Sequence, residues 1–433
     1  MSSPDIDGKR LVRLLALGLI IGIPAAAGAA AFTSVEHWLQ HLLWTDLPDS
    51  FGWEQPAAWW IVLVLIVGAL LVMAAARLPG HGGHNPMDGL AFDIGPRQIA
   101  SVVLVAWASL AFGAVLGPEA PLMAIGTAIA VLFARRAEAD ARQVLMFAGA
   151  MAAMSLILGN PLIVSILLLE AVALGGSKGQ AIVKVLPALA ALASGYLVQL
   201  GFAGLPGVGS SALAVPGLPT YDQVQWQDLL ISVPLAVVVA AVVVVALRGA
   251  EILRPIVTRR PDLMLLAIAA VVGILTVLAT WLDPDISYDL ILFSGQAAIP
   301  TILTFSAVGT LALVAVVKTI AFALCLPSGF RGGILFPAVY IGVVLGTLAA
   351  SLLDFVSLTA MVATGIAAAA AAIFRLPFTA VLLSVMLCAS AGLASTSLAI
   401  IAAIIGLLFR VGMDASSGLL GPRVMAKAEE PAA

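Results

Sequence analysis

Long apolar runs are the feature that most constrains this chain. About 20 consecutive apolar residues are enough for a helix to cross a bilayer. Across the 433 residues, 62% are hydrophobic and 10% are charged, whereas a soluble domain carries about a quarter charged residues. The sequence therefore predicts an all-α, polytopic membrane protein. The clearest spans are residues 14–32, 59–76, 100–114, 181–202, 229–247, 263–282, 301–326, 333–352 and 393–409.

Other apolar runs are shorter and are interrupted by glycine or proline. The interruptions lie around Pro86, Pro121, Pro161 and Pro377. Proline is accepted in the first turn of a helix, because its missing N–H would have no partner there in any case. We therefore expect tilted or partial helices at these positions rather than simple spans.

Charge and cysteine content exclude several other classes of protein. The net charge of −3 comes without a strong basic surface, which argues against a nucleic-acid partner. Cys325 and Cys388 lie in apolar segments, so we expect packing rather than a disulfide framework or a metal site. We also expect no cofactor. Lys9, Arg10 and Arg13 precede the first apolar run, which predicts a cytoplasmic N-terminus.

Two stretches half a chain apart repeat one pattern. GPEAPLMAIG at residues 117–126 and GILFPAVYIG at 333–342 both read G-x-x-x-P-x-x-x-I-G. The same offset of 216 residues pairs Gly149 with Gly365. Several matches at one offset indicate an internal duplication, and repeated halves with broken helices are typical of membrane transporters. The pattern leaves open whether the two halves are parallel or inverted.

Each copy of the pattern also predicts part of an anion site. A helix that starts inside the membrane has unpaired N–H groups and a positive dipole end, and an anion is a natural partner for both. Glycine lets another group approach the backbone closely. Two such helix starts facing each other would bind an anion without a positively charged side chain. A third candidate is GHGGHNPMDGL at residues 80–90, with a helix expected to start at Pro86.

The three stretches resemble the signature motifs of the CLC family of chloride channels and anion/proton antiporters. The family's middle motif, G-[KR]-E-G-P, is similar to GPEAP at residues 117–121, and its third, G-x-F-x-P, to GILFP at 333–337. Its first, G-S-G-x-P, is similar to GGHNP at 82–86. The resemblance implies an inverted-repeat fold whose broken helices meet at a midplane anion site, and a homodimer with one pore in each subunit.

The resemblance assigns roles to individual residues. Glu119 would be the gate, a carboxylate that occupies the outer anion site when ionised and leaves it when protonated. Leu335 and Phe336 would bind the anion through backbone N–H groups, and Gly83 and Asn85 would present further donors to the same cavity. A charged side chain at a membrane helix centre costs about 2.5–3.5 kcal/mol, so Glu119 needs a compensating role. A structural cap or a carboxylate in a hydrated loop is the alternative.

The chain departs from the family at three positions. Gly83 replaces a serine whose hydroxyl binds the anion, and Ser417 falls where the family has an anion-binding tyrosine. Glu170 matches the first of two adjacent glutamates, so the inner proton site falls on Ala171. Fluoride-selective members also lack the usual serine and inner glutamate, yet remain proton-coupled. An antiporter, a passive channel and an uncoupled carrier therefore stay open, with bicarbonate or fluoride as alternatives to chloride.

Five further residues have more than one interpretation. His81 and His84 could satisfy loop backbone groups, or His84 could contact the anion and make transport depend on pH. Glu170 is expected to anchor a helix through hydrogen bonds, with a proton role as the alternative. We interpret Arg375 as a helix-end residue, and Lys318 as a buried partner or a snorkelling side chain.

The sequence favours a transport protein rather than an enzyme. An intramembrane protease would need a catalytic pair in facing spans, and a purely structural protein would not explain two matching helix starts. We expect a cytoplasmic segment at residues 1–13, repeats at 14–216 and 217–427, a tail at 428–433, and no cytoplasmic regulatory domain. The expected partners are a small monovalent anion (chloride by default), protons, the lipid bilayer and a second copy of the chain.

Overall fold

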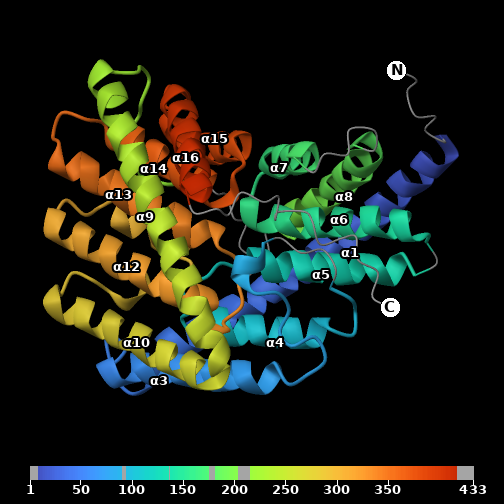
Figure 1. Ribbon diagram of the computed structural model, residues 1–433, viewed down its shortest axis with the longest axis horizontal. Coiled ribbons are helices and arrows are strands. Elements are labelled where there is room, and N and C mark those ends of the chain that lie inside the picture. Colours follow the sequence, from blue (N-terminus) through green and yellow to red (C-terminus); the bar gives the residue numbers. More distant parts are fainter. Residues whose placement is uncertain (1–7, 90–93, 136, 175–180, 203–214, 417–433) are drawn as a thin grey trace.

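The computed structural model describes residues 8–89, 94–135, 137–174, 181–202 and 215–416. Within these ranges every regular element is helical and no strand forms. Nine helical segments of this described part are long and apolar enough to span a membrane, and five shorter apolar helices lie among them. Most of the first half, blue to green in Figure 1, lies beside the second half, yellow to red. The predicted all-α polytopic fold is confirmed.

In its described residues, the first half contains eight α-helices and one short 3₁₀ turn, η2 (Pro86–Asp88). α1 continues through a π-helical turn (Leu42–Asp46) directly into α2. The α-helices are α1 (Gly8–His41), α2 (Leu47–Ser50), α3 (Ala58–Ala75), α4 (Ile99–Leu110), α5 (Glu119–Phe133), α6 (Ala139–Leu158), α7 (Pro161–Leu174) and α8 (Ala181–Phe202).

The second half, as far as Ser416, also contains eight α-helices. The expected span at residues 301–326 is wrong at its start, because the chain turns after α11, where the Phe305 N–H donates to Ile302 O, and a new helix begins at Val308. The helices are α9 (Trp226–Arg259), α10 (Pro261–Leu282), α11 (Ile299–Ile302), α12 (Val308–Ser328), α13 (Leu335–Leu352), α14 (Leu358–Phe374), α15 (Pro377–Leu387) and α16 (Thr396–Ser416), with 3₁₀ turns η3 (Tyr288–Leu290), η4 (Gln296–Ala298) and η5 (Ala389–Ala391).

Several helices of the two halves correspond at or near the offset of 216 residues. α5 and α13 start 216 residues apart, at Glu119 and Leu335, and α1 and α9 each contain 34 residues. α6 and α14 are followed by the same left-handed conformation, at Gly159 (φ 57°) and Arg375 (φ 58°). Arg375 is therefore the helix-end residue that the sequence predicts. The predicted limits of the two repeats and of the terminal segments stay a prediction.

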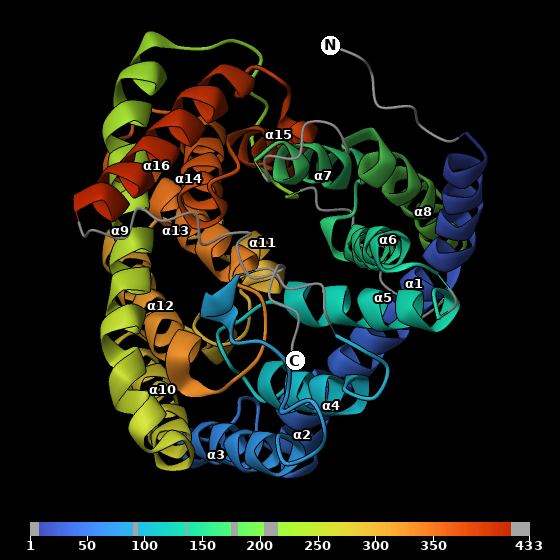
Figure 2. The ribbon, with the colours of Figure 1, turned by 45° about the vertical axis from the view of Figure 1, so that its right-hand side comes forward.

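α5 and α13 start beside one another and run towards opposite sides of the molecule (Figures 1 and 2). Just before the two helices, Gly117 and Gly333 form an isolated antiparallel β-bridge. In such a pair the two residues exchange equivalent backbone bonds, so a local two-fold axis passes between them. This local symmetry fits halves that are inverted relative to one another.

Close helix crossings recur in both halves. α5 crosses α6 at Gly126 and Gly149, and α13 crosses α14 at Gly342 and Gly365. A Cβ atom at any of these four positions would collide with the carbonyl oxygen of the partner glycine. Small residues let the backbones of membrane helices approach closely. The crossings explain why these glycines recur at the same offset.

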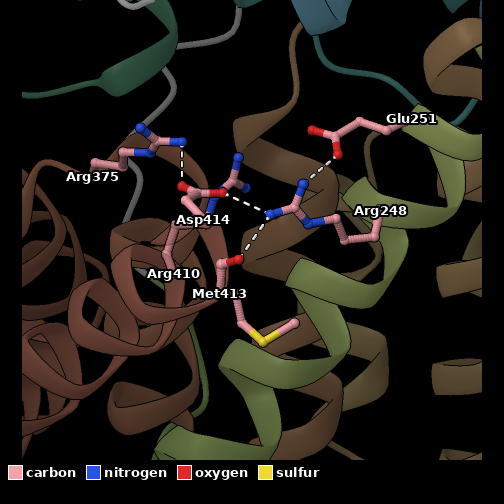
Figure 3. Close-up of polar contacts among 6 residues, drawn as sticks. All are labelled: Arg248, Glu251, Arg375, Arg410, Met413 and Asp414. Carbon is pink, nitrogen blue, oxygen red and sulfur yellow. Dashed lines mark hydrogen bonds and ion pairs between the residues drawn. The ribbon is translucent and has the colours of Figure 1, made fainter. Parts of the chain in front are cut away.

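A buried carboxylate joins three segments of the second half (Figure 3). The Asp414 side chain on α16 is 4% exposed and pairs with Arg248 of α9 at 3.0 Å, with Arg410 at 3.0 Å and with Arg375. Arg248 also pairs with Glu251 at 2.7 Å. Three guanidinium groups converge on one carboxylate, so α9, α16 and the end of α14 are held together at this point.

Lys318 lies on α12 and is fully buried. Its Nζ donates to Leu292 O at 2.7 Å and to Phe293 O at 3.0 Å, and it lies 4.8 Å from the centroid of the Tyr340 ring. The interpretation of Lys318 as a buried partner is confirmed, and the snorkelling alternative is wrong.

Candidate functional site

The two matching motifs meet at their first glycines. The Gly117 N–H donates to Gly333 O at 2.8 Å, and the Gly333 N–H donates back to Gly117 O. α5 begins two residues after Gly117, and α13 begins two residues after Gly333. Helix starts from the two halves therefore lie next to each other, which is the geometry that the repeated sequence predicts for an anion site.

Glu119 reaches from the start of α5 to the start of α13. Its Oε1 accepts the Phe336 N–H at 2.9 Å. The residue is 2% exposed, and its Oε2 is buried with no hydrogen-bond partner among the described residues. The first N–H groups of a helix have no partner within the helix and carry a partial positive charge. The carboxylate therefore lies where a free anion would be stabilised.

The motif glycines leave space for this carboxylate. A Cβ atom at Gly333 or at Gly117 would overlap the carboxylate of Glu119. A Cβ atom at Gly332 would lie 2.6 Å from Cβ of Leu116 and 2.8 Å from Gly117 O. Side chains at these positions would force Glu119 away from α13 or push the two motifs apart.

Leu335 and Phe336 contribute backbone groups rather than side chains. Both side chains are buried in the hydrophobic core. The Phe336 N–H binds Glu119. Leu335 is the first residue of α13, so its N–H has no intrahelical partner either. The geometry agrees with the expected backbone ligands, and their role in anion binding stays a prediction.

The first motif forms a loop and a single helical turn. Pro86 begins η2, and Asn85 caps this turn by accepting the Met87 N–H at 3.0 Å through Oδ1. The Gly82 N–H donates to Ser101 Oγ at 2.8 Å, which ties the loop to α4. The predicted helix start at Pro86 is therefore confirmed only as one 3₁₀ turn within the described residues. The Oδ1 of Asn85 therefore acts as the cap of this turn, since an asparagine that precedes a helical turn accepts a hydrogen bond from one of the free N–H groups of the turn.

Gly83 and His84 line a small cavity beside this loop. The cavity has a volume of about 150 Å³, and Gly80, Ile94 and Gln98 complete its lining. His84 is exposed there. The first motif thus presents an open cavity, whereas the carboxylate of Glu119 is enclosed.

The structural interpretations of His81 and Glu170 are confirmed. The Nδ1 of His81 lies 3.2 Å from Ala76 O within the loop. Glu170 on α7 accepts the N–H groups of Phe378 (3.0 Å) and Thr379 (2.8 Å), and its Oε2 also accepts the Thr379 hydroxyl at 2.7 Å. Glu170 thus caps the start of α15 and anchors it to α7.

Two other predicted positions give less information about the site. Ala171 follows Glu170 on α7 and has only a methyl side chain, so it cannot carry a proton. Ser417, the candidate ligand near the C-terminus, lies outside the described residues.

Arg331 is a charged residue beside the site that sequence reasoning missed. It lies two residues before Gly333, and its N–H donates to Ser109 Oγ at 3.0 Å. Its Nε and Nη1 are buried with no hydrogen-bond partner in the described part of the chain. The signal that could have found it is a lone arginine directly before a glycine-rich helix start, in an otherwise apolar stretch.

Known proteins match this chain in both sequence and fold. The sequence profile of the family described as Voltage gated chloride channel matches residues 80–411. The chain belongs to this family, the CLC family. CLC proteins are channels and transporters, so the expectation that the chain is not an enzyme is confirmed. CLC-family anion transport by a multi-pass membrane protein follows from the same match.

Two sequence relatives of this CLC protein are named YfeO and are described as ion-transport proteins. YfeO of Escherichia coli (strain SMS-3-5 / SECEC) is 28% identical over 351 residues, which cover 78% of this chain and 79% of the relative. YfeO of Salmonella newport (strain SL254) is 30% identical over 354 residues, covering 78% and 80%.

Two solved structures share the fold of this CLC protein. A slow cyanobacterial Cl⁻/H⁺ antiporter has a TM-score of 0.73 at 18% identity, covering 98% of this chain and 100% of that one. A CLC-type fluoride/proton antiporter has a TM-score of 0.71 at 19% identity, covering 94% and 98%. At these identities the likeness shows the fold alone, and it confirms the CLC-type inverted repeat.

Proposed function

We propose that this CLC protein moves a small monovalent anion, with chloride as the first candidate, past a gate formed by the Glu119 carboxylate. The observation that carries the proposal is the hydrogen bond from the Phe336 N–H to Glu119 Oε1 at 2.9 Å. A mobile anion would be stabilised by the same end of α13. The side chain and the anion therefore compete for one position, and the anion passes only when the side chain has left it.

Protonation supplies the step that moves the side chain. The positive end of α13 attracts an ionised carboxylate and has much less attraction for a neutral carboxyl group. Oε2 of Glu119 has no hydrogen-bond partner among the described residues, so it is the oxygen at which a proton would be accepted. Each cycle would then exchange a proton at Glu119 for an anion in the site. The antiporters that share the fold support this version of the mechanism.

A passive channel or an uncoupled carrier is the second candidate, and Ala171 favours it. Ala171 occupies the expected inner proton position and has no titratable group. Its neighbour Glu170 uses both oxygens at the start of α15, so Glu170 is not free to replace the missing group. Protons would then need a route that avoids this position.

The remaining site residues enter the proposal as ligands. Backbone N–H groups would provide most of the anion binding. The cavity beside Gly83 and His84 supports the proposal that the anion can reach the first motif. The N-terminus would lie in the cytoplasm, and two copies of the chain would form a homodimer. The proposed ligands are Gly83, His84, Asn85, Leu335, Phe336 and Ser417.

Flux from proteoliposomes tests the proposal. Purified protein is reconstituted with chloride, fluoride or bicarbonate inside the vesicles, and anion efflux is recorded together with pH. Anion-linked proton movement in the wild type that is lost in Glu119→Gln, while anion flux continues, would support the gate. Flux without proton movement in the wild type would favour the passive alternative. No flux of any of these anions would refute the proposal.

A further inference from the structure

Two of the three guanidinium nitrogens of Arg331 are buried beside the third motif without an acceptor among the described residues. Its Nε and Nη1 have no hydrogen-bond partner among the described residues. An arginine side chain stays charged in proteins, and buried donors without a partner are unfavourable. Lys318, by contrast, donates to two carbonyl oxygens. Arg410 also has a buried Nη1 with no hydrogen-bond partner among the described residues, but its Nε donates to the carboxylate of Asp414.

The backbone fixes Arg331 between the first and third motifs. Its N–H donates to Ser109 Oγ at 3.0 Å, and that hydroxyl donates to Val105 O at 2.7 Å, so the loop before α13 is tied to α4. Two residues later, Gly333 pairs with Gly117. η2 of the first motif packs against α12, the helix that ends just before this loop. An anion that moves between these two motifs would therefore meet Arg331.

The charges around Arg331 leave an excess of positive charge. Asp88, at the end of η2, acts on Arg331 electrostatically. The Oδ1 of Asp88 is already paired with Nη2 of Arg254 at 2.5 Å. The single negative charge of Asp88 is thus shared between the guanidinium groups of Arg254 and Arg331. The Asp88 and Arg254 side chains are 42% and 43% exposed, so solvent screens their charges and Asp88 neutralises Arg331 only weakly.

We propose that the Arg331 guanidinium is a side-chain ligand for the transported anion, at a site between η2 and the loop that leads into α13. This inference rests on the anion transport proposed above. It adds a positive charge to a pathway in which Gly83 replaces a serine whose hydroxyl binds the anion in the family. A hydrogen bond between a guanidinium and an anion is stronger than one between neutral groups. The site is separate from the position that Glu119 occupies at the start of α13.

Anion-dependent thermal stability measures binding without requiring transport. Purified protein is titrated with chloride in place of gluconate at constant ionic strength, and the melting temperature is followed. Arg331→Gln should raise the half-saturating chloride concentration by about tenfold or more. Arg259→Gln is the matched control, because it removes the same charge at the exposed end of α9. It should leave the half-saturating concentration within about twofold of the wild type.

Asp88→Asn is a second test with the opposite sign. It removes the carboxylate that competes for Arg331, so chloride should bind about threefold more tightly. Asp88 is a surface residue, so this variant decides the question even if Arg331→Gln does not fold. An unchanged midpoint in Arg331→Gln, or weaker binding in Asp88→Asn, would overturn the inference while leaving anion transport intact. A wild type that neither transports chloride, fluoride or bicarbonate nor is stabilised by them would refute the proposed function itself.

Discussion

The carboxylate of Glu119 accepts a hydrogen bond from the backbone N–H of Phe336, 217 residues further along the chain. Glu119 begins α5, and the donor lies in the first turn of α13, the matching helix of the second half. The proposed gate of one half is therefore held by the other half. This relationship decides what several substitutions should do.

Glu119→Gln should abolish the pH dependence of gating and any proton coupling while anion flux continues. A glutamine amide cannot ionise, so it has no charge with which to compete against the anion at the positive end of α13. Anion flux against pH in proteoliposomes checks this, with Glu251→Gln as a control away from the site. Proton-linked transport at the wild-type level in Glu119→Gln would contradict the gating role.

Gly333→Ala should displace Glu119 without removing its charge. The added methyl group would overlap Oε2 of Glu119, so the bond to Phe336 should weaken. Anion flux at alkaline pH, where the wild-type gate is ionised and closed, should increase. Gly309→Ala on α12 is the matched control, because a Cβ atom there meets no atom within 4 Å. If both variants show the wild-type curve, the loop can adjust and Glu119 keeps its place.

Glu170→Ala should destabilise the fold while leaving anion selectivity unchanged. Glu170 accepts three hydrogen bonds at the start of α15, and loss of a helix cap costs about 0.5–2 kcal/mol. The melting temperature of the purified protein measures the effect. Glu170→Gln, which retains one acceptor oxygen, should lose less. Loss of proton movement at an unchanged melting temperature would assign a proton role to Glu170 instead.

Asp414→Asn should destabilise the protein far more than Glu251→Gln. Asp414 pairs with three arginines in a buried position, and breaking a buried ion pair from one side costs about 3–5 kcal/mol. Glu251 is 37% exposed and pairs with Arg248, so solvent reduces its contribution. Melting temperatures of the two variants give the comparison. Equal values would show that the buried cluster does not hold α9 and α16 together.

His84→Ala should weaken anion transport or change anion preference, and it should remove a component of the pH dependence near neutrality. Histidine is the side chain that ordinarily changes charge between about pH 5 and 8, and His84 lines the cavity of the first motif. Flux against pH is compared in the wild type, each single variant and the double variant with Glu119→Gln. His81→Ala is the matched control. If His84→Ala shows the wild-type dependence of flux on pH and the wild-type anion preference, His84 only stabilises the loop.

The features that could be predicted from the sequence are those that allow few alternatives. Gly126 and Gly149 can be recognised in the sequence because only glycine permits the close crossing of α5 and α6. The same restriction applies to the crossing of α13 and α14, so the glycines recur there. Glu119 was recognisable because a carboxylate in an apolar run has few structural explanations. The repeat and the two helix starts follow from these positions.

The features that could not be predicted depend on partners distant in the sequence. Nothing around Glu170 indicates that Thr379, 209 residues away, is its partner. Arg331 is similarly inconspicuous, because η2 is brought beside α12 only in the folded protein. The error at residues 301–326 has another cause. The turn after Ile302 contains no charged residue, glycine or proline, so the sequence does not reveal it.

The bond between Glu119 and Phe336 also imposes an order on biosynthesis. A chain grows from its N-terminus at about 5–20 residues per second, so Phe336 is made about 10 to 40 seconds after Glu119. During that interval the nascent first half contains the carboxylate but lacks the N–H group that holds it in the finished protein. The position that Glu119 occupies in the finished protein is therefore created only when the second half has left the ribosome and packed against the first.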